Sequence, residues 1–478
     1  MSYIAAFDAG TTAVKGVLIE LNGQGVVSCS ADIPTLYHGA YKEQDPAAWW
    51  AAFQSVCRRL LQEADPAEIA AVVMSGQMQD LILLDKDLSP VCGAILYSDG
   101  RAGEQARQLE AAVGAERYLH ITGNRCDGSL PLPKLMWLKA EQPELYARTA
   151  HVLISSKDYL IAKLTGVCCG DITACSTAGA MDIRRKCWDA SLLSAAGIPV
   201  SLLPPLYAPH QQVGTVLSAT DCGLFPGTPV FAGIGDAGAT TLASGISQPG
   251  QYNINLGTSG WVAAVSQDIL LTEAGVFNLA AAKADCYINV VPFLNAGGVH
   301  KWIAGVLGDY ASTSALLAAS APGSHGVLCL PYLAGERFPV LDADATGCYL
   351  GLTPETSAAD LARSALEGVA FSLRQGLEQL GAAPSSISLI GGGGREAVWC
   401  QILADVLGHD ITVFQETAFF ASQALAAVAL RGLGQIDDYR DFSAGGGYTL
   451  YTPHSENRQL YDGLYARYKK LYPALRGL

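Results

Sequence analysis

Near its start the chain reads Tyr3-Ile4-Ala5-Ala6-Phe7-Asp8-Ala9-Gly10-Thr11-Thr12, an apolar run that ends in an acid, a glycine and two hydroxyl residues. A related stretch, Asn255-Leu256-Gly257-Thr258-Ser259, stands far downstream beside further alternating apolar residues. Each stretch predicts a strand, a tight glycine turn and a returning strand. Such a turn can direct backbone N–H groups and hydroxyls toward a phosphate. Two copies favour two related lobes that hold one polyphosphate; two unrelated hairpins are the alternative.

The composition is that of a large acidic protein. The 478 residues include 30 Lys and Arg against 44 Asp and Glu, which gives a net charge of −14, and half of them are apolar. This length predicts two large domains or about three smaller ones. The acidic balance argues against nucleic acid or an anionic membrane as a partner. It still permits an anionic ligand that backbone amides and a metal ion hold locally.

The thirteen cysteines predict reduced thiols in a cytoplasmic protein. Cys168 and Cys169 are adjacent and no C-x-x-C pair occurs, so the spacing fits neither a zinc site nor a disulfide framework. The sequence has no apolar run of about 18 residues that would predict a membrane span. It also lacks a basic segment followed by an apolar stretch near Met1, so no secretion signal is expected.

Strand and helix patterns follow a similar order in the two halves, which predicts an old duplication of an α/β unit. In the first half we expect strands at 3–7, 14–21, 26–33 and 69–74, with a helix from Asp45-Pro46. In the second half we expect strands at 252–256, 260–265, 287–293, 387–390 and 411–414, and helices at 357–380, 397–407 and 421–430. The turn-rich segment 245–250 is the expected boundary, giving domains 1–245 and 246–478.

Asp236 lies in a glycine turn between an expected strand at 229–234 and an expected helix at 238–244. The turn, Gly233-Ile234-Gly235-Asp236-Ala237-Gly238, matches the G-x-G-x-x-G pattern of dinucleotide-binding folds. Those folds also need an acid about 20 residues further on, and none occurs between Asp236 and Asp268. A carboxylate at the end of a strand can instead accept a proton from a substrate hydroxyl. An Asx-turn or a helix N-cap is the alternative use of Asp236.

Asp8 occupies a similar place after the first strand. A carboxylate beside a phosphate-binding turn is well placed to hold Mg²⁺, directly or through water. The phosphate donors would come from the turns and from a cation on the returning strand whose direction the sequence leaves open: Thr11, Thr12, Gly257, Thr258, Ser259 and Lys15. Gly391–Gly394 would be a flat platform for a ring or a ribose, with a flexible loop as the alternative.

Two polar segments could bind a polyhydroxylated ligand. They are Gln77-Met78-Gln79-Asp80 and Asp99-Gly100-Arg101. Amide, carboxylate and guanidinium groups make directional hydrogen bonds to several hydroxyls at once. Ordinary exposed loops carry the same residue types.

Together these segments resemble the FGGY carbohydrate kinases, and within them the branch that phosphorylates xylulose. The resemblance covers nearly the whole chain in order, through the segments Phe7–Thr12, Ser75–Met78, Asp99–Arg101, Gly235–Asp236, Asn255–Gly260, Pro331–Arg337 with Gly351–Thr353, and Gly391–Arg395 with Trp399. The order and spacing of these motifs carry the resemblance more than any single one.

The resemblance implies two ribonuclease-H-like domains of the actin-like ATPase kind, with ATP and Mg²⁺ in the cleft between them. It implies that Asp236 is the general base and also contacts the sugar, and that Asp8 is the acid that holds the metal ion. The implied sugar contacts are Gln77, Met78, Gln79, Asp99 and Arg101. The implied ATP contacts add Gly392, Gly393, Gly394 and Arg395 to those of the two turns. A homodimer is a further expectation.

Two departures from the resemblance fall on the sugar side. Gln79 stands where xylulose-phosphorylating members usually have His, and Tyr97-Ser98 stands where they have Trp-Asn. We therefore expect a kinase for a small sugar such as the ketopentose D-xylulose, with another ketose or a polyol as alternatives. A binding or regulatory protein on the same scaffold is the competing hypothesis from another class.

Overall fold

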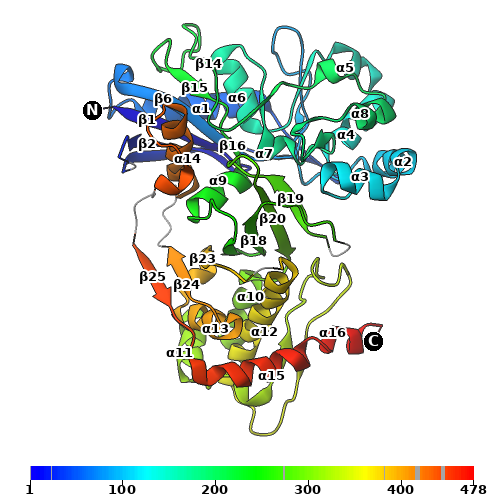
Figure 1. Ribbon diagram of the computed structural model, residues 1–478, viewed down its shortest axis with the longest axis vertical. Helices are drawn as coiled ribbons and strands as arrows, with labels where there is room; N and C mark the ends of the chain where they lie inside the picture. Colours follow the sequence, from blue (N-terminus) through cyan, green and yellow to red (C-terminus); the bar gives the residue numbers. More distant parts are fainter. Residues whose placement is uncertain are drawn as a thin grey trace.

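Two lobes, each built on a seven-stranded sheet, make up the computed structural model (Figure 1). It describes residues 2–22, 24–272, 275–381, 383–414, 420–442 and 447–477. Residues 1, 23, 382 and 478 and the segments 273–274, 415–419 and 443–446 lie outside the described residues.

The N-terminal sheet is mixed. Its strands are β1 (Tyr3–Ala9), β2 (Ala13–Glu20), β3 (Gly25–Asp32), β6 (Ile69–Gly76), β14 (Gln212–Thr215), β15 (Pro229–Phe231) and β16 (Ile234–Gly235). The strand order is β14-β15-β6-β1-β2-β3, with β16 also paired to β6. Strand β2 is antiparallel to its neighbours β1 and β3, and β6 continues the sheet parallel to β1.

The C-terminal sheet repeats this plan. Its strands are β17 (Gln251–Leu256), β18 (Gly260–Ser266), β19 (Phe277–Ala280), β20 (Tyr287–Phe293), β23 (Ser386–Ile390), β24 (Ile411–Phe414) and β25 (Tyr448–Tyr451). Here β17, β18 and β20 are antiparallel, and β23 and β24 continue the sheet parallel to β17. The expected duplication of an α/β unit is thus present as matching topology.

Strand alternation explains how β1 is buried on both faces. Tyr3, Ala5 and Phe7 join the core formed with helix α1 (Pro46–Leu60). Ile4 and Ala6 point to the other face and pack with helix α14 (Phe420–Gly432). Successive side chains of a strand alternate between faces, so a strand covered on both sides reads as one apolar run. Asp45 accepts a hydrogen bond from the Ala47 N–H at 2.9 Å and caps α1, as expected.

Smaller elements surround the N-terminal sheet. The helices are α2 (Gly103–Val113), α3 (Ala115–Thr122), α4 (Pro131–Glu141), α5 (Pro143–Arg148), α6 (Ser156–Thr165), α7 (Ile172–Cys175), α8 (Ala190–Ala196) and α9 (Asp236–Ala243). The short strands are β4 (Leu36–His38), β5 (Tyr41–Gln44), β7 (Ile82–Leu84), β8 (Ala94–Ile95), β9 (His151–Leu153), β10 (Gly170–Asp171), β11 (Met181–Asp182), β12 (Cys187–Trp188) and β13 (Leu206–Tyr207).

The C-terminal lobe has its own core around a long helix. Its helices are α10 (Gly297–Leu307), α11 (Tyr310–Ala319), α12 (Ala358–Gln379), α13 (Ala397–Leu407), α15 (Arg458–Tyr468) and α16 (Leu471–Leu475), with the strands β21 (Leu328–Leu330) and β22 (Cys348–Leu350). Ser357 and Asp360 form a capping box at the start of α12, which is buried along most of its length.

Helix α14 belongs to the C-terminal half of the sequence but lies in the N-terminal lobe. Its apolar residues, including Leu425 and Val428, pack with Ile4, Val17 and Val73 of the N-terminal sheet (Figure 1). The strands that precede and follow it in the sequence, β24 and β25, both belong to the C-terminal sheet. The division at residue 245 remains a prediction about sequence units, because the N-terminal lobe in space also contains α14.

Most expected elements are present close to their expected ends. Strands β17, β18, β20 and β24 end within one residue of the expected positions. Helix α9 is different, because it begins at Asp236 instead of residue 238. The thirteen cysteines are free thiols. In the part of the chain that the structure describes, every helix is too short or too polar to cross a membrane.

Candidate active site

Asp8 and Asp236 lie on either side of the carboxyl end of β6. Strand β1 runs parallel to β6 with Asp8 opposite Ser75. Strand β16 runs parallel to the same end of β6 with Gly235 opposite Gly76, and Asp236 follows directly. Two acids that are far apart in sequence therefore meet at one edge of the sheet.

The electrostatics of this pair favour protonation. Burial raises the pKa of Asp8, although the Ser75 hydroxyl, which donates to Asp8 Oδ1 at 2.7 Å, and the charge of Lys15 oppose the rise. Desolvation by neighbouring protein atoms is the main cause that raises the pKa of Asp236 to about 7, and the charge of Asp8 adds to it. A hydrogen bond from the Ala237 N–H, at 2.7 Å, acts in the opposite direction and lowers the pKa. Asp236 is nonetheless an exposed residue, so a substrate can approach it.

Lys15 lies on the same face of the sheet as Asp8. The two residues are directly opposite on β1 and β2, so their side chains leave the sheet on the same side. Ile4, Ala6, Val17 and Ile19 share that face and pack with α14. The structure thus shows that the Lys15 side chain leaves the sheet on the Asp8 side, a direction that the sequence left open.

Hydrogen bonds with other segments of the N-terminal lobe hold the first glycine turn in place. The Thr11 hydroxyl donates to Gln77 Oε1 at 3.0 Å, and Gln44 Nε2 donates to the Thr11 carbonyl at 2.6 Å. The Ser156 hydroxyl donates to the Ala9 carbonyl at 2.6 Å. Thr12 is exposed. These contacts occupy carbonyls of the turn and fix its shape.

The second glycine turn lines a cavity of about 650 Å³ in the C-terminal lobe. The cavity contains five of the residues expected at a nucleotide site: Gly257, Thr258, Gly392, Gly393 and Arg395. Ser259 and Gly394 are not in its lining, and Thr11, Thr12 and Lys15 are on the other lobe. The sequence interpretation missed Gly297, Gly298, His300, Lys301, Tyr310, Ser314 and Glu396. The pair Gly297-Gly298 after an apolar strand was the available signal.

The glycine run at the cavity has two different structural roles. A Cβ atom at Gly393 would lie 2.7 Å from the Leu256 Cβ, and one at Gly391 would lie 2.6 Å from the Leu256 backbone. A Cβ atom at Gly392 would meet no atom within 4 Å. Gly391 and Gly393 thus allow close packing on β17, whereas Gly392 borders open space.

The segment Gln77–Asp80 lies next to the turn that carries Asp236. Met78 is buried beside Gly235 and Ala174. Gln77 Nε2 donates to Gln44 Oε1 at 2.9 Å, so the side-chain amide of Gln77 already has a hydrogen-bond partner within the protein. Gln79 has a left-handed backbone, with φ of 63°, and its side chain is partly exposed.

Asp99 and Arg101 bind each other. The Arg101 guanidinium donates to both carboxylate oxygens of Asp99, at 3.0 and 2.6 Å, and forms an ion pair with Glu43 at 2.9 Å. It lies 4.0 Å from the ring centroid of Tyr41 and 5.0 Å from that of Trp137. Burial opposes the ionised form of Asp99, but the Arg101 contacts hold the pKa of Asp99 below its ordinary value.

Lys134 joins the two polar segments, which the sequence did not reveal. This fully buried amine donates to the Leu96 carbonyl at 2.7 Å and to the Gln79 carbonyl at 3.2 Å. The buried Asp80 carboxylate accepts from the Tyr97 N–H at 3.1 Å. Burial lowers the pKa of Lys134 to about 8 and raises that of Asp80. One lysine therefore fixes the relative position of both loops.

A second buried lysine supports the segment before Asp236. Lys157 forms ion pairs with Asp158 at 2.5 Å and Asp171 at 2.9 Å, and all three side chains are fully buried. Asp171 Oδ1 accepts from the Gly235 N–H at 3.4 Å. Burial disfavours the charge on Lys157, but the two carboxylates outweigh that effect and hold its pKa above the ordinary value.

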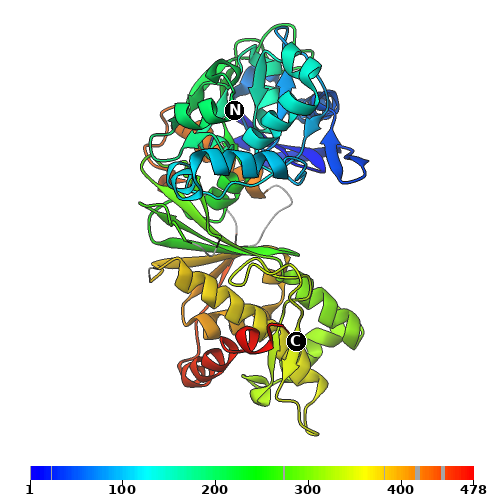
Figure 2. The same ribbon diagram turned by 90° about the vertical axis from the view of Figure 1, so that its right-hand side faces the viewer.

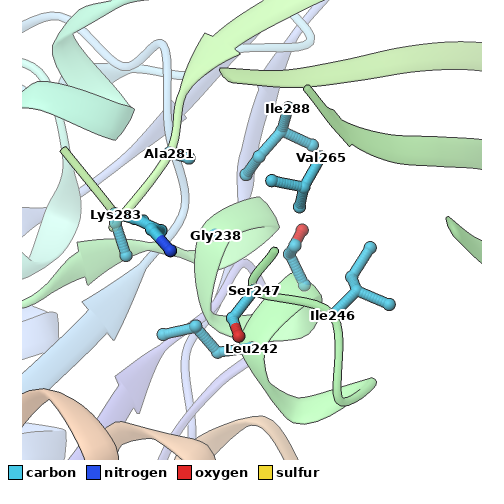
Figure 3. A pocket seen from close by; sticks show the side chains of 10 residues that line it. Gly238, Leu242, Ile246, Ser247, Val265, Ala281, Lys283 and Ile288 are labelled. Atoms are coloured by element: carbon cyan, nitrogen blue, oxygen red, sulfur yellow. The ribbon is translucent and has the colours of Figure 1, made fainter. Parts of the chain in front are cut away.

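Helix α9 carries Asp236 at its first residue, packs mainly on α14 and β6, and borders the C-terminal sheet. Figure 3 shows Gly238 and Leu242 of α9 with Val265 of β18 and Ile288 of β20 around a small cavity of about 10 Å³. Figure 2 shows the strands of the C-terminal sheet running beneath the N-terminal lobe at this level. The base of the N-terminal lobe and the C-terminal sheet thus meet at the helix that begins with Asp236.

Two sheets of ribonuclease-H-like topology, one in each lobe, place the chain in the class of two-lobed proteins with the actin-like fold. Comparisons with known proteins identify the family. Residues 3–243 match the N-terminal domain of the FGGY family of carbohydrate kinases, and residues 252–430 match its C-terminal domain. The chain belongs to the FGGY family of carbohydrate kinases.

Relatives within the family include enzymes for different acceptors. The chain is 32% identical over 414 residues to the xylulose kinase of Escherichia coli (strain K12), which covers 84% of each protein. A ligand-bound xylulose kinase structure from Lactobacillus acidophilus has a TM-score of 0.92 at 26% identity, covering 100% of this chain and 99% of that one. A gluconate kinase structure from the same organism has a TM-score of 0.92 at 27% identity, covering 100% and 98%. The chain is thus a xylulokinase-like sugar kinase in fold and sequence.

Proposed function

We propose that this kinase transfers the γ-phosphate of ATP to a hydroxyl of a small uncharged ketose, such as the ketopentose D-xylulose, with Asp236 as general base. The observation that carries the proposal is the carboxylate of Asp236, beside Asp8 at the end of β6, with its pKa raised to about 7. A general base works best when its pKa is near the operating pH. Asp236 would accept the proton of the sugar hydroxyl as that hydroxyl attacks phosphorus.

The charges around the acceptor loops favour an uncharged sugar. A sugar acid such as gluconate would need a cation to pair with its carboxylate. Arg101 is already paired with Asp99 and Glu43, and Lys134 is buried against two backbone carbonyls. Gln79 offers a neutral amide that can donate to one hydroxyl and accept from another. We infer that Met78 and Gln79 contact the sugar, whereas Gln77, Asp99 and Arg101 hold the loops in shape.

Asp8 is the proposed ligand of Mg²⁺, directly or through water. One of its oxygens accepts from Ser75, and its other oxygen has no hydrogen-bond donor among the described residues. Hard oxygen donors suit Mg²⁺, which is commonly held by one or two carboxylates together with phosphate oxygens. The described residues contain no group of three or more acids, histidines or cysteines arranged around a metal position. When bound, the ion would neutralise charge on the phosphates.

The two glycine turns are the proposed binding groups for the phosphates. Thr11, Thr12 and Lys15 would act from the N-terminal lobe, and Gly257, Thr258 and Ser259 from the C-terminal lobe. The cavity beside Gly392, Gly393, Gly394 and Arg395 is large enough for an adenosine. Phosphoryl transfer needs mainly alignment and charge neutralisation, which two lobes can supply as they approach. A homodimer and a cytoplasmic location remain predictions.

A substrate screen tests the acceptor class. We expect purified protein with Mg·ATP to release ADP in the presence of D-xylulose or another ketose, and catalytic efficiency with D-gluconate to be at least about a hundredfold lower. The Asp236→Asn variant, carried through the same purification, controls for contaminating kinases. Sugar-independent ADP release across ketoses and polyols would favour a binding or regulatory protein. A preference for D-gluconate would contradict the uncharged acceptor.

The pH dependence of the reaction tests the base. Because the pKa of Asp236 is raised to about 7, the catalytic form is lost as the pH falls through that value. We expect kcat/KM to fall tenfold per pH unit below about pH 6 and to level off above about pH 8. The measurement uses subsaturating Mg·ATP so that it reports the free enzyme. A profile that stays flat down to pH 5 would contradict the assignment.

A further inference from the structure

Glu336 and Asn295 form a buried hydrogen-bonded cluster behind the nucleotide cavity. Glu336 is 2% exposed and Asn295 is 4% exposed. Glu336 Oε1 accepts from the N–H groups of Leu294 and Arg337, at 2.7 and 2.8 Å. Its Oε2 accepts from the backbone N–H and the side-chain amide of Asn295, at 3.3 and 2.9 Å. Among the described residues, no cation forms an ion pair with Glu336.

The chemistry of this cluster requires a carboxylate. Four N–H groups converge on the Glu336 side chain, two on each oxygen. A carboxylate accepts at both oxygens, whereas an amide would turn an NH₂ group toward two of the donors. Burying an unpaired carboxylate is costly unless hydrogen bonds replace its hydration. The four bonds replace that hydration and fix the backbone at 294–295.

Asn295 extends the cluster to the loop on the other side. Its side-chain amide donates to the Gly335 carbonyl at 2.6 Å, and its side-chain oxygen accepts from the Leu333 N–H at 2.9 Å. The loop 333–337 is thereby fastened to the end of β20. This loop is part of the family-like motif Pro331–Arg337, to which the sequence interpretation gave no role.

Strand β20 is followed directly by α10, whose first residues, Gly297 and Gly298, line the nucleotide cavity. Helix α10 begins at Gly297, two residues after Asn295. The Gly297 N–H donates to the Gly257 carbonyl at 2.7 Å, and the Gly298 N–H donates to the Thr258 carbonyl at 2.9 Å. A Cβ atom at Gly297 would lie 2.5 Å from the Gly257 oxygen, so any side chain at position 297 would clash with the turn. The position of the phosphate-binding turn thus depends on where α10 starts.

We propose that Glu336 and Asn295 are positioning residues for the nucleotide: they hold the start of α10 against the Gly257–Thr258 turn. The inference rests on the proposed use of this cavity by ATP. Neither side chain lines the cavity, so each acts through the backbone that it holds. Loosening the cluster would let α10 and the turn separate, and the phosphate donors would lose their common geometry.

The test is the Glu336→Gln variant, with Glu355→Gln as a matched control at an exposed position in the same lobe. We expect Glu336→Gln to weaken binding of Mg·ATP about tenfold or more by titration calorimetry without sugar, and to raise the KM for ATP to a similar extent. The KM for the sugar should change less than twofold. The control should match the wild type in all three measurements.

Three further outcomes are distinguishable. A Glu336→Gln variant that melts earlier but binds Mg·ATP like the wild type would overturn the inference, because the cluster would then be purely structural. If this variant fails to fold, Asn295→Ser, which keeps the Glu336 carboxylate and removes the three side-chain hydrogen bonds of Asn295, should show the same selective loss of ATP affinity; unchanged affinity would overturn the inference. Wild-type protein that binds no Mg·ATP would contradict the proposed function itself.

Discussion

Replacing Asp236 with Asn is expected to lower the rate of sugar phosphorylation by at least about 10²–10⁴-fold. The amide keeps the size of the side chain and can still accept from the Ala237 N–H, but it cannot take a proton from the sugar hydroxyl. The measurement is kcat with the best acceptor found in the screen, at saturating Mg·ATP. Calorimetric affinity for Mg·ATP should stay within about threefold of the wild type.

The control for this prediction is Asp32→Asn at an exposed position of the same lobe, which should leave kcat unchanged. Thermal stability gives a second check with a defined sign. Because the folded-state pKa of Asp236 is raised, the wild-type side chain costs stability as the pH rises through the range from about 4 to 7. Asp236→Asn lacks that cost, so its melting temperature relative to the wild type should be higher at pH 8 than at pH 5. Full turnover by this variant would contradict the role of Asp236.

The Lys157→Met variant is expected to lose about 3–5 kcal/mol of stability. Removing the amine leaves Asp158 and Asp171 buried side by side without a cation. A folded domain has only about 5–15 kcal/mol in total, so the loss should appear as a large drop in melting temperature or as poor expression. Since Asp171 also accepts from the Gly235 N–H, any folded fraction should have reduced activity.

The matched control is Lys86→Met, which removes an exposed lysine from a surface turn and should change stability by less than about 0.5 kcal/mol. The double variant Lys157→Met/Asp171→Asn removes one of the two unpaired charges and should recover part of the melting temperature. If Lys157→Met melts like the wild type, the triad contributes little to stability.

The acids and glycines of the candidate site could be located from short local patterns, although their roles remain predictions. Asp236 stood out because the turn around it lacks the acid that a dinucleotide fold needs further along the chain. Asp8 lies at the end of β1, Gly257 follows β17 directly and Gly392 lies just beyond β23, and the carboxyl ends of parallel strands meet at one edge of a sheet. The Glu336–Asn295 cluster could not be found in this way, because its partners are distant in sequence.

The contacts of several expected sugar residues also could not be predicted. Asp99 and Arg101 form a pair with Glu43, and the aromatic rings of Tyr41 and Trp137 stack on the guanidinium. The residue types alone indicate hydrogen-bonding capacity, but they do not indicate whether a protein group already uses it. The sequence therefore left a ketose or a polyol open as the acceptor, and the paired cations of the folded loops add an argument against a charged sugar.

The family, the duplicated α/β plan, and the acids and glycines near strand ends could be inferred from the sequence, because strand alternation and turn chemistry are local. The position of α14 in the N-terminal lobe, the shared face of Lys15 and Asp8, and the full burial of Lys134 and Lys157 became visible in the fold. A buried charge is stable only beside partners that the fold brings together, and those partners lie anywhere along the chain.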